Sequence, residues 1–236
     1  MLDRISTRIF ADGADLDGIL ALAANPRIEG FTTNPTLMRK AGLTDYTRFA
    51  RTLLERIDTH PISFEVFADE PAEMRRQARL IDSWGENVYV KIPVTTTAGQ
   101  PLSALVRELS EEGVKVNVTA VFTPAQVESV AVAVRDGAPS CISVFAGRIA
   151  DAGVDPVPIM ARAMELIADA PRAELIWASP REILNIVQAD RVGCHIITVT
   201  HDLLGKLDCL GTELEWYSLE TVRMFHRDAA TAGFTL

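Results

Sequence analysis

The sequence predicts an α/β protein that folds as a single (β/α)8 TIM barrel with an additional C-terminal helix. Short runs rich in β-branched residues alternate with amphipathic segments, and eight such runs occur along the chain. This alternation is typical of parallel strands joined by helical crossovers, and a count of eight favours a closed barrel. An open doubly wound sheet usually has a glycine-rich GxGxxG loop after its first strand. The segment RIFADGADLDG has no such loop, so we expect the barrel.

Each expected strand combines β-branched or aromatic residues with a period of two. The strands are expected at residues 8–12, 30–34, 62–68, 88–94, 115–122, 141–147, 173–179 and 194–200. Segments with helical periodicity lie between them, at residues 44–58, 73–84, 102–113, 123–137 and 156–170. No linker or composition shift interrupts the series, so residues 1–236 are predicted to form one domain.

The last part of the chain exceeds what a minimal barrel requires. Residues 211–236 are predicted to form a C-terminal helical extension. This extension either packs on its own barrel, reaches a neighbouring subunit or covers the site, and its pattern does not choose among these. We expect the protein to be a homo-oligomer.

Composition and charge exclude several classes of partner. The net charge of −9 argues against general binding to nucleic acid or to anionic membranes, because both need a positive field. No apolar run approaches the roughly 20 residues that span a bilayer, and the N-terminus has no signal-peptide core. The three cysteines, Cys141, Cys194 and Cys209, form no CxxC pair. Such unpatterned thiols are typical of a reducing compartment, so we expect a cytoplasmic protein.

Polar side chains are expected on the inward face of seven strands. Residues two apart on a strand share a face. In VYVKIPV the aliphatic Val88, Val90 and Ile92 must meet the helices, which turns Lys91 into the barrel. The corresponding positions on other strands are Asp12, Thr32, Asn34, Glu65, Asn117, Thr119, Ser143 with Phe145, and Trp177 with Ser179. One such residue alone is usually a satisfied core hydrogen bond. Because an unpaired buried polar group costs about 1–3 kcal/mol, seven strands carrying them indicate a functional site.

Lys91 stands out among only four lysines, against 19 arginines. The others, at a turn, a strand start and a late helix, are Lys40, Lys115 and Lys206. Burial in an apolar setting disfavours the ammonium form and makes a lysine amine a nucleophile towards carbonyls. The plainer alternative is a lysine buried only to pair with Asp12 or Glu65.

Several ordered motifs resemble the transaldolase family. GFTTNPT (30–36) resembles the family motif G-[VI]-T-T-N-P-[TS], and VYVKIPVT (88–95) resembles the segment that carries the family's Schiff-base lysine. NVTAVFT, ISVFAGRIAD and ASPRE follow in the family's order, and Asp12 stands 22 residues before Asn34 as in the family pattern. The resemblance covers essentially the whole chain, at the length of the small transaldolases.

The resemblance implies a lysine Schiff-base mechanism on sugar phosphates. Lys91 would form an iminium at the C2 carbonyl, Glu65 would act as acid and base through a water held by Thr119, and Asp12 would carry the C4-hydroxyl proton. The implied substrate contacts are Thr32, Asn34, Asn117, Ser143 and Phe145, and the implied phosphate ligands are Arg148, Ser179 and Arg181. No cofactor and no metal are expected, because the iminium is itself the electron sink. The four histidines also lack metal-ligand spacing.

Three functions remain open at this stage. In the family, transaldolases move a dihydroxyacetone unit from a ketose phosphate, such as sedoheptulose 7-phosphate or fructose 6-phosphate, to an aldose phosphate. Fructose-6-phosphate aldolases use free dihydroxyacetone, and they typically have Gln in place of Glu65 and Tyr in place of Phe145, so the chain resembles the transferases. A non-catalytic sugar-phosphate-binding protein is the third. The threonine-rich loop TTTAGQPLSAL (95–105) is longer than the family's usual one, which leaves open the acceptor and the choice between the pentose phosphate pathway and a specialised one.

Overall fold

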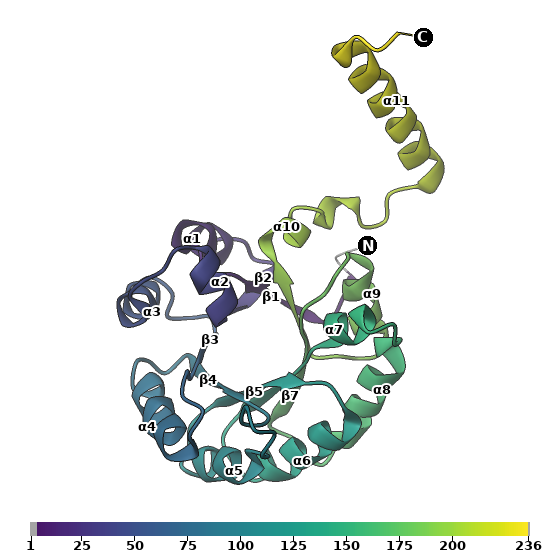
Figure 1. Ribbon diagram of the computed structural model, residues 1–236. Coiled ribbons are helices and arrows are strands. Elements are labelled where there is room, and N and C mark those ends of the chain that lie inside the picture. Colours follow the sequence, from purple (N-terminus) through teal and green to yellow (C-terminus); the bar gives the residue numbers. More distant parts are fainter. Residues whose placement is uncertain (1–3, 236) are drawn as a thin grey trace.

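The computed structural model describes residues 4–235, so residues 1–3 and 236, at the ends of the expected domain, lie outside the described residues. Eight parallel strands close into a barrel in chain order, and helices surround it (Figure 1). The strands are β1 (Arg8–Asp12), β2 (Ile28–Thr32), β3 (Ile62–Glu65), β4 (Val88–Pro93), β5 (Val116–Val121), β6 (Ser140–Val144), β7 (Ala173–Trp177) and β8 (Ile196–Thr200). The predicted (β/α)8 architecture is confirmed.

Four helices begin with a capping side chain directly followed by proline, namely α2, α4, α6 and α8. The cap accepts a hydrogen bond from a free helical N–H, and proline suits the first turn because its missing N–H would have no partner there. The helices are α1 (Leu16–Ala23), α2 (Pro35–Lys40), α3 (Tyr46–Leu54), α4 (Pro71–Asp82), α5 (Ser103–Glu111), α6 (Pro124–Val134), α7 (Ala146–Asp151), α8 (Pro156–Leu166), α9 (Leu184–Arg191), α10 (His201–Leu204) and α11 (Leu214–Ala232), with the 3-10 turn η2 (Leu207–Cys209).

The second strand begins and ends two residues earlier than the predicted 30–34. The side chain of Asn34 caps α2, because its Oδ1 accepts a hydrogen bond from Leu37 N at 2.9 Å, and Pro35 is the first helical residue. The sixth strand likewise ends at Val144 instead of 147, since α7 begins at Ala146. Both strands therefore give way to a helix directly at the carboxyl end of the barrel.

The core has two layers. A large apolar cluster lies between the strands and the helices, and a small one fills the barrel interior around Phe10, Cys141, Ile176 and Ile196. Gly30 makes room for the Phe10 ring, because a Cβ at Gly30 would lie 2.6 Å from the ring atoms. The interior below the carboxyl ends of the strands is therefore packed.

The predicted inward orientation of Trp177 is wrong. Ile176 pairs in register with Ser143 and belongs to the interior cluster, whereas Trp177 is fully buried in the outer cluster. Since side chains alternate along a strand, a shift of one residue in parity exchanges the two faces. The large indole packs between sheet and helices, where there is space for it.

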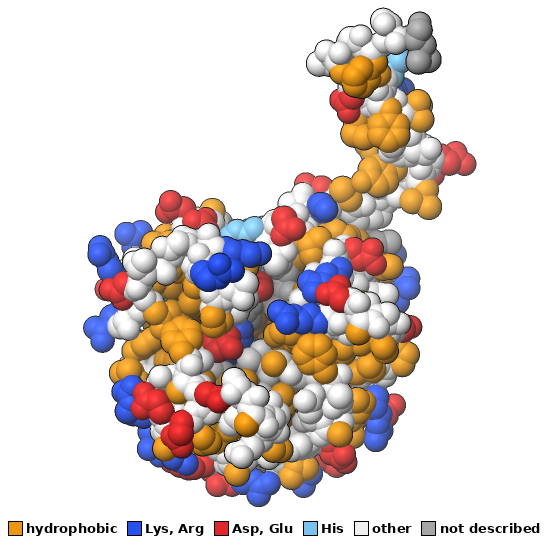
Figure 2. Space-filling view, in the orientation of Figure 1, with side chains coloured by type: hydrophobic (Ala, Val, Ile, Leu, Met, Phe, Trp, Pro, Cys, Tyr) orange, Lys and Arg blue, Asp and Glu red, His pale blue; other side chains and the backbone are white. Residues whose placement is uncertain are grey.

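Helix α11 projects away from the barrel, and none of its residues is buried (Figure 1). Hydrophobic side chains lie along it in the space-filling view (Figure 2). Leu214, Tyr217, Met224 and Phe225 recur at helical spacing and are 78%, 48%, 41% and 62% exposed. Within residues 4–235, no helix is both long and apolar enough to cross a membrane.

Candidate active site

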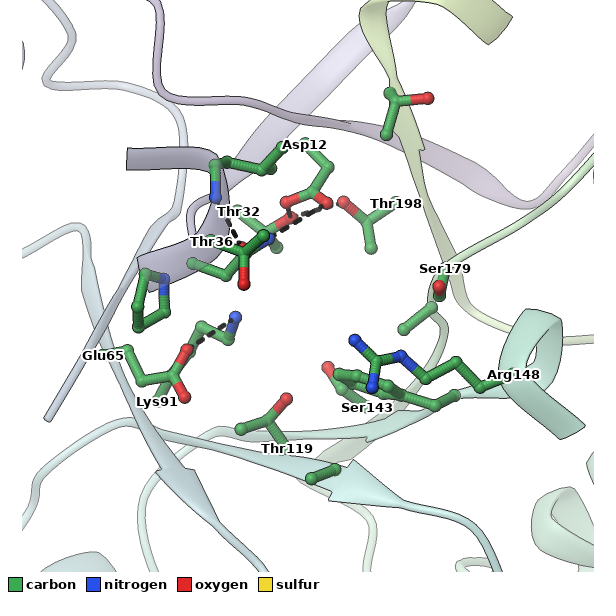
Figure 3. A pocket seen from close by; sticks show the side chains of 17 residues that line it. Asp12, Thr32, Thr36, Glu65, Lys91, Thr119, Ser143, Arg148, Ser179 and Thr198 are labelled. Carbon is green, nitrogen blue, oxygen red and sulfur yellow. Dashed lines mark hydrogen bonds and ion pairs between the residues drawn. The ribbon is translucent and has the colours of Figure 1, made fainter. Parts of the chain in front are cut away.

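A cavity of about 440 Å³ opens at the carboxyl ends of the strands, where Asp12, Thr32 and Glu65 are the last residues of β1, β2 and β3 (Figure 3). Ten of the twelve residues predicted for the site line this cavity. They are Asp12, Thr32, Asn34, Glu65, Lys91, Thr119, Ser143, Phe145, Arg148 and Ser179. This is the end of the barrel at which (β/α)8 enzymes carry their active sites.

Lys91 points into the cavity from the middle of β4, and its side chain is only 7% exposed. Its Nζ donates a hydrogen bond to the Thr33 carbonyl oxygen at 2.6 Å and lies 3.3 Å from Glu65 Oε2. Glu65 and Lys91 are register partners on β3 and β4, so the sheet itself sets this pair. A buried amine beside a carboxylate has both a nucleophile and a proton acceptor at one point.

Asp12 lies on the neighbouring side of the cavity. Its Oδ1 accepts a hydrogen bond from Thr32 Oγ1 at 2.8 Å, and Asn34 Nδ2 lies 3.5 Å from its Oδ2. Burial raises the pKa of Asp12, an effect that the charge of Lys91 and the hydrogen bond from Thr32 partly offset. Because this carboxyl holds its proton more tightly than an exposed aspartate, it is suited to both accepting and returning a proton.

Arg148 enters the cavity from α7, opposite Lys91 and Glu65 (Figure 3). Its guanidinium carbon lies 5.4 Å from the centre of the Phe145 ring. Ser179 follows β7 with a left-handed backbone, at φ +62°. Gly147 lets α7 approach this residue closely, since a Cβ there would lie 1.6 Å from the Ser179 carbonyl oxygen. A cation and a hydroxyl thus face the lysine across the cavity, an arrangement suited to an anionic group.

Thr119 and Asn117 take different positions on β5. Thr119 lines the cavity, and its Oγ1 is buried without a hydrogen-bond partner among residues 4–235. Asn117 is buried behind the lining, where its Nδ2 donates to Ser63 Oγ at 3.0 Å and its Oδ1 accepts from Ser143 Oγ at 2.7 Å. Asn117 therefore supports Ser143 from below.

Arg181 does not line the cavity. Its Nε donates a hydrogen bond to Asp151 Oδ1 at 2.9 Å, and the pair is about half exposed. Asp151 ends α7, the helix that carries Arg148. Only one of the two arginines predicted for the phosphate is thus directed into the cavity.

Three further threonines line the cavity that were not predicted as site residues, namely Thr36, Thr198 and Thr200. Thr198 Oγ1 shares a hydrogen bond with Thr32 Oγ1, and Thr200 is the register partner of Asp12. The period of two in IITVT is a signal that could have identified Thr198 and Thr200 as inward-facing, because they share a face with the inward Ile196. Thr36 had no such signal, since it lies on the first turn of α2.

A buried lysine beside a carboxylate, with a second carboxylate and an arginine in the same cavity at the carboxyl end of a parallel barrel, defines a (β/α)8 protein with a polar pocket suited to an anionic ligand. The chain matches the model of the Transaldolase/Fructose-6-phosphate aldolase family over residues 9–235. It belongs to this family of transferases and aldolases that use sugar phosphates.

Relatives of known description support the same family. A protein named "Probable transaldolase" from Dehalococcoides mccartyi is 35% identical over 201 residues, which is 85% of this chain and 89% of that protein. Another of the same name from Methanococcus maripaludis is 33% identical, with the same coverage of both chains. Among solved structures, a dihydrodipicolinate synthase from Rhodopseudomonas palustris superposes with a TM-score of 0.57 at 17% identity, covering 82% of this chain and 69% of that one. At that identity the likeness concerns the fold alone.

Proposed function

We propose that the protein is a transaldolase-type transferase that moves a dihydroxyacetone unit from a ketose phosphate to an aldose phosphate through a Schiff base on Lys91. The observation that carries this proposal is the Lys91 amine, buried 3.3 Å from the Glu65 carboxylate in the same cavity as Asp12. Such an amine, once it has passed a proton to Glu65, can add to the C2 carbonyl of a ketose.

The reaction proceeds in balanced steps. Lys91 loses a proton to Glu65, and its Nζ then bonds to C2 while the π bond of the carbonyl breaks. One proton passes from the nitrogen to the carbonyl oxygen, which gives a neutral carbinolamine. Protonation of the C2 hydroxyl by Glu65 releases water and leaves the iminium. Asp12 then takes the C4-hydroxyl proton while the C3–C4 bond breaks, so the aldose phosphate leaves and the electron pair enters the iminium as an enamine. The enamine then adds to an acceptor aldehyde, and Asp12 returns its proton to the new C4 hydroxyl. Hydrolysis of the resulting iminium releases the product ketose and completes the transfer.

The remaining polar residues bind the sugar in this proposal. Thr32, Asn34 and Ser143 contact donor hydroxyls, and Asn117 acts through Ser143. Thr119 Oγ1, which lacks a partner in the described chain, holds the water that Glu65 activates. The phosphate is bound by Arg148 and Ser179, since Arg181 is engaged by Asp151.

Borohydride trapping tests the proposal. Incubation with fructose 6-phosphate and borohydride should leave a stable adduct on the peptide that contains Lys91, identified by mass. Lys91→Met should lose both the adduct and turnover, whereas the control Lys206→Met, at an exposed lysine, should keep both. An adduct on another lysine, or none in the wild-type protein, would refute the Schiff base at Lys91.

Acceptor dependence separates transfer from aldol cleavage. With erythrose 4-phosphate or glyceraldehyde 3-phosphate present, a transferase converts the ketose only in step with the acceptor. Release of free dihydroxyacetone without an acceptor would instead identify an aldolase, the other activity in the family's description. Glu65 and Phe145, both of the transferase type, favour the first outcome.

We also propose that the protein works in the cytoplasm as a homo-oligomer. The three free cysteines suit a reducing compartment. The unburied apolar side of α11 supports self-association, because an exposed stripe of this kind is typical of an interface.

A further inference from the structure

Glu65 lies where the hydrogen bonding between β2 and β3 ends. Phe31 N donates to the Pro61 carbonyl oxygen at 2.9 Å, and Thr33 N donates to that of Ser63 at 3.2 Å. The next donor in this series, two residues further on, would be residue 35. That residue is proline, which has no N–H. The carbonyl oxygen of Glu65 therefore has no donor from the β2 side.

The N–H of Glu65 also lacks its usual partner. In the same series it would donate to the carbonyl oxygen of Thr33. That oxygen instead accepts the hydrogen bond from Lys91 Nζ at 2.6 Å. The opposite edge of β3 provides no substitute, since there Val66 N, and not Glu65 N, donates to the Lys91 carbonyl oxygen. Both backbone polar groups of Glu65 thus need a partner from outside the sheet.

Tyr46 on α3 supplies both partners with one hydroxyl. Its Oη accepts a hydrogen bond from Glu65 N at 2.8 Å and donates one to the Glu65 carbonyl oxygen at 3.1 Å. A neutral phenol has one donor and free lone pairs, so it can do both. Burial raises the pKa of Tyr46, which keeps the phenol neutral.

The ring of Tyr46 is held in place by other aromatic side chains. Its centre lies 4.6 Å from that of Phe67, 5.7 Å from Trp84 and 6.1 Å from Phe64, all in edge-to-face arrangements. Such contacts restrict the ring and so fix the hydroxyl. Tyr46 does not line the catalytic cavity, so it cannot touch a substrate there directly.

We infer that Tyr46 is a positioning residue: its hydroxyl replaces strand β2 beside Glu65, sets that carboxylate against Lys91, and leaves the Thr33 carbonyl oxygen free to hold the lysine. This inference rests on the proposed function, because it gives Glu65 and Lys91 their catalytic roles. Without the hydroxyl, both backbone polar groups of Glu65 lose their partner. The distance between the Glu65 carboxylate and Lys91 Nζ is then no longer fixed.

Tyr46→Phe is the direct test, because it keeps the ring and its packing and removes only the hydroxyl. Tyr89→Phe is the matched control, since Tyr89 is partly buried in the barrel interior and packs against the interior cluster away from the cavity lining. We expect Tyr46→Phe to lower kcat about tenfold with KM within about twofold, as small displacements of catalytic groups slow chemistry more than binding. The rate of iminium formation in a single turnover should fall by the same factor. Tyr89→Phe should change neither.

A double-mutant cycle separates positioning from general destabilisation. In a Glu65→Ala background no carboxylate remains to be positioned, so Tyr46→Phe should slow iminium formation by a clearly smaller factor, which reports only its effect on the Thr33 carbonyl oxygen that holds Lys91. An equal loss in both backgrounds, or an unchanged kcat in the single variant, overturns the inference.

Hydrogen exchange tests the contact without any substrate. The peptide that contains Glu65 should gain fast-exchanging amide hydrogen in Tyr46→Phe and not in Tyr89→Phe. Unchanged exchange also overturns the inference. Failure of the proposed function has a different signature, because the wild-type protein itself would then form no adduct on Lys91.

Discussion

Replacing Asp12 by asparagine should remove a contribution to the free energy of unfolding that declines as the pH rises. Asp12 is buried, and its pKa is raised mainly by the loss of hydration. The folded state therefore keeps a proton on Asp12 at pH values where the unfolded chain, with an aspartate pKa of about 3.9, has released it. The stabilisation from this proton is fully present below the unfolded pKa and is lost as the pH rises through the folded pKa. The asparagine side chain of the variant is neutral throughout and lacks this dependence.

The expected magnitude follows from linkage. While the folded state binds one more proton than the unfolded state, the free energy of unfolding falls by up to about 1.4 kcal/mol per pH unit. Urea unfolding of both proteins from about pH 4 to pH 8 gives the difference, wild type minus variant, at each pH. Effects of the altered hydrogen bonds with Thr32 and Asn34 add an offset that changes little with pH. The difference should therefore decline with pH and then level off.

Asp69→Asn is the control of opposite sign. Hydrogen bonds from Thr97 lower the pKa of Asp69, so its contribution is fully present above the unfolded aspartate pKa of about 3.9 and is lost as the pH falls through the lower folded pKa. The urea series for this pair therefore extends below pH 4. The wild-type minus variant difference should rise with pH for Asp69 and fall for Asp12. A flat or rising difference for Asp12 would refute the argument that burial dominates its protonation.

The other predictions concern the phosphate end of the cavity, its packing and α11. Arg148→Ala should raise KM for a phosphorylated substrate far more than Arg181→Ala, and equal effects in steady-state kinetics would contradict the assignment of the phosphate to Arg148. Gly147→Ala should destabilise the fold by about 1–3 kcal/mol and weaken phosphate binding, because the new methyl group meets the Ser179 carbonyl; an unchanged melting temperature would show that α7 can shift freely. Phe225→Glu on the apolar side of α11 should reduce the sedimentation coefficient without unfolding the barrel, and an unchanged coefficient would argue against association through this helix.

The fold was largely predictable because hydrophobic periodicity is a local property. The first strand was predicted at its observed bounds, and the fourth, expected at 88–94, ends one residue earlier. The strand over 28–32 was displaced in the prediction because threonines favour strands, although Asn34 and Pro35 together form a strong helix start. Parity failed on β7, where LIWA (175–178) is apolar on both faces and only pairing with β6 decides the orientation.

The site was predictable where a residue lies on a strand and less so elsewhere. Lys91, Glu65 and Asp12 follow from alternation, and register brings Glu65 beside Lys91. Arg181 illustrates the limit, because its partner Asp151 lies 30 residues away and no local pattern joins them. The role of Tyr46 could not be predicted from the sequence either, since it depends on the Glu65 carbonyl oxygen, which Pro35 leaves without a donor.

The packed interior around Phe10 closes the cavity at its inner end, so in the described part of the chain the cavity opens only at the carboxyl ends of the strands. Phe10, Ile176 and Ile196 are at most 3% exposed, so the described chain leaves no passage through the barrel. In the proposed reaction the departing aldose phosphate and the incoming acceptor must therefore pass through the same opening of the cavity, one after the other. The three-carbon fragment stays tethered to the lysine during that exchange. The protein then acts as a transferase if the acceptor adds to this fragment before water releases it, and as an aldolase if hydrolysis is faster. The rate of hydrolysis of the bound fragment, more than the rate of C3–C4 cleavage, decides between the two.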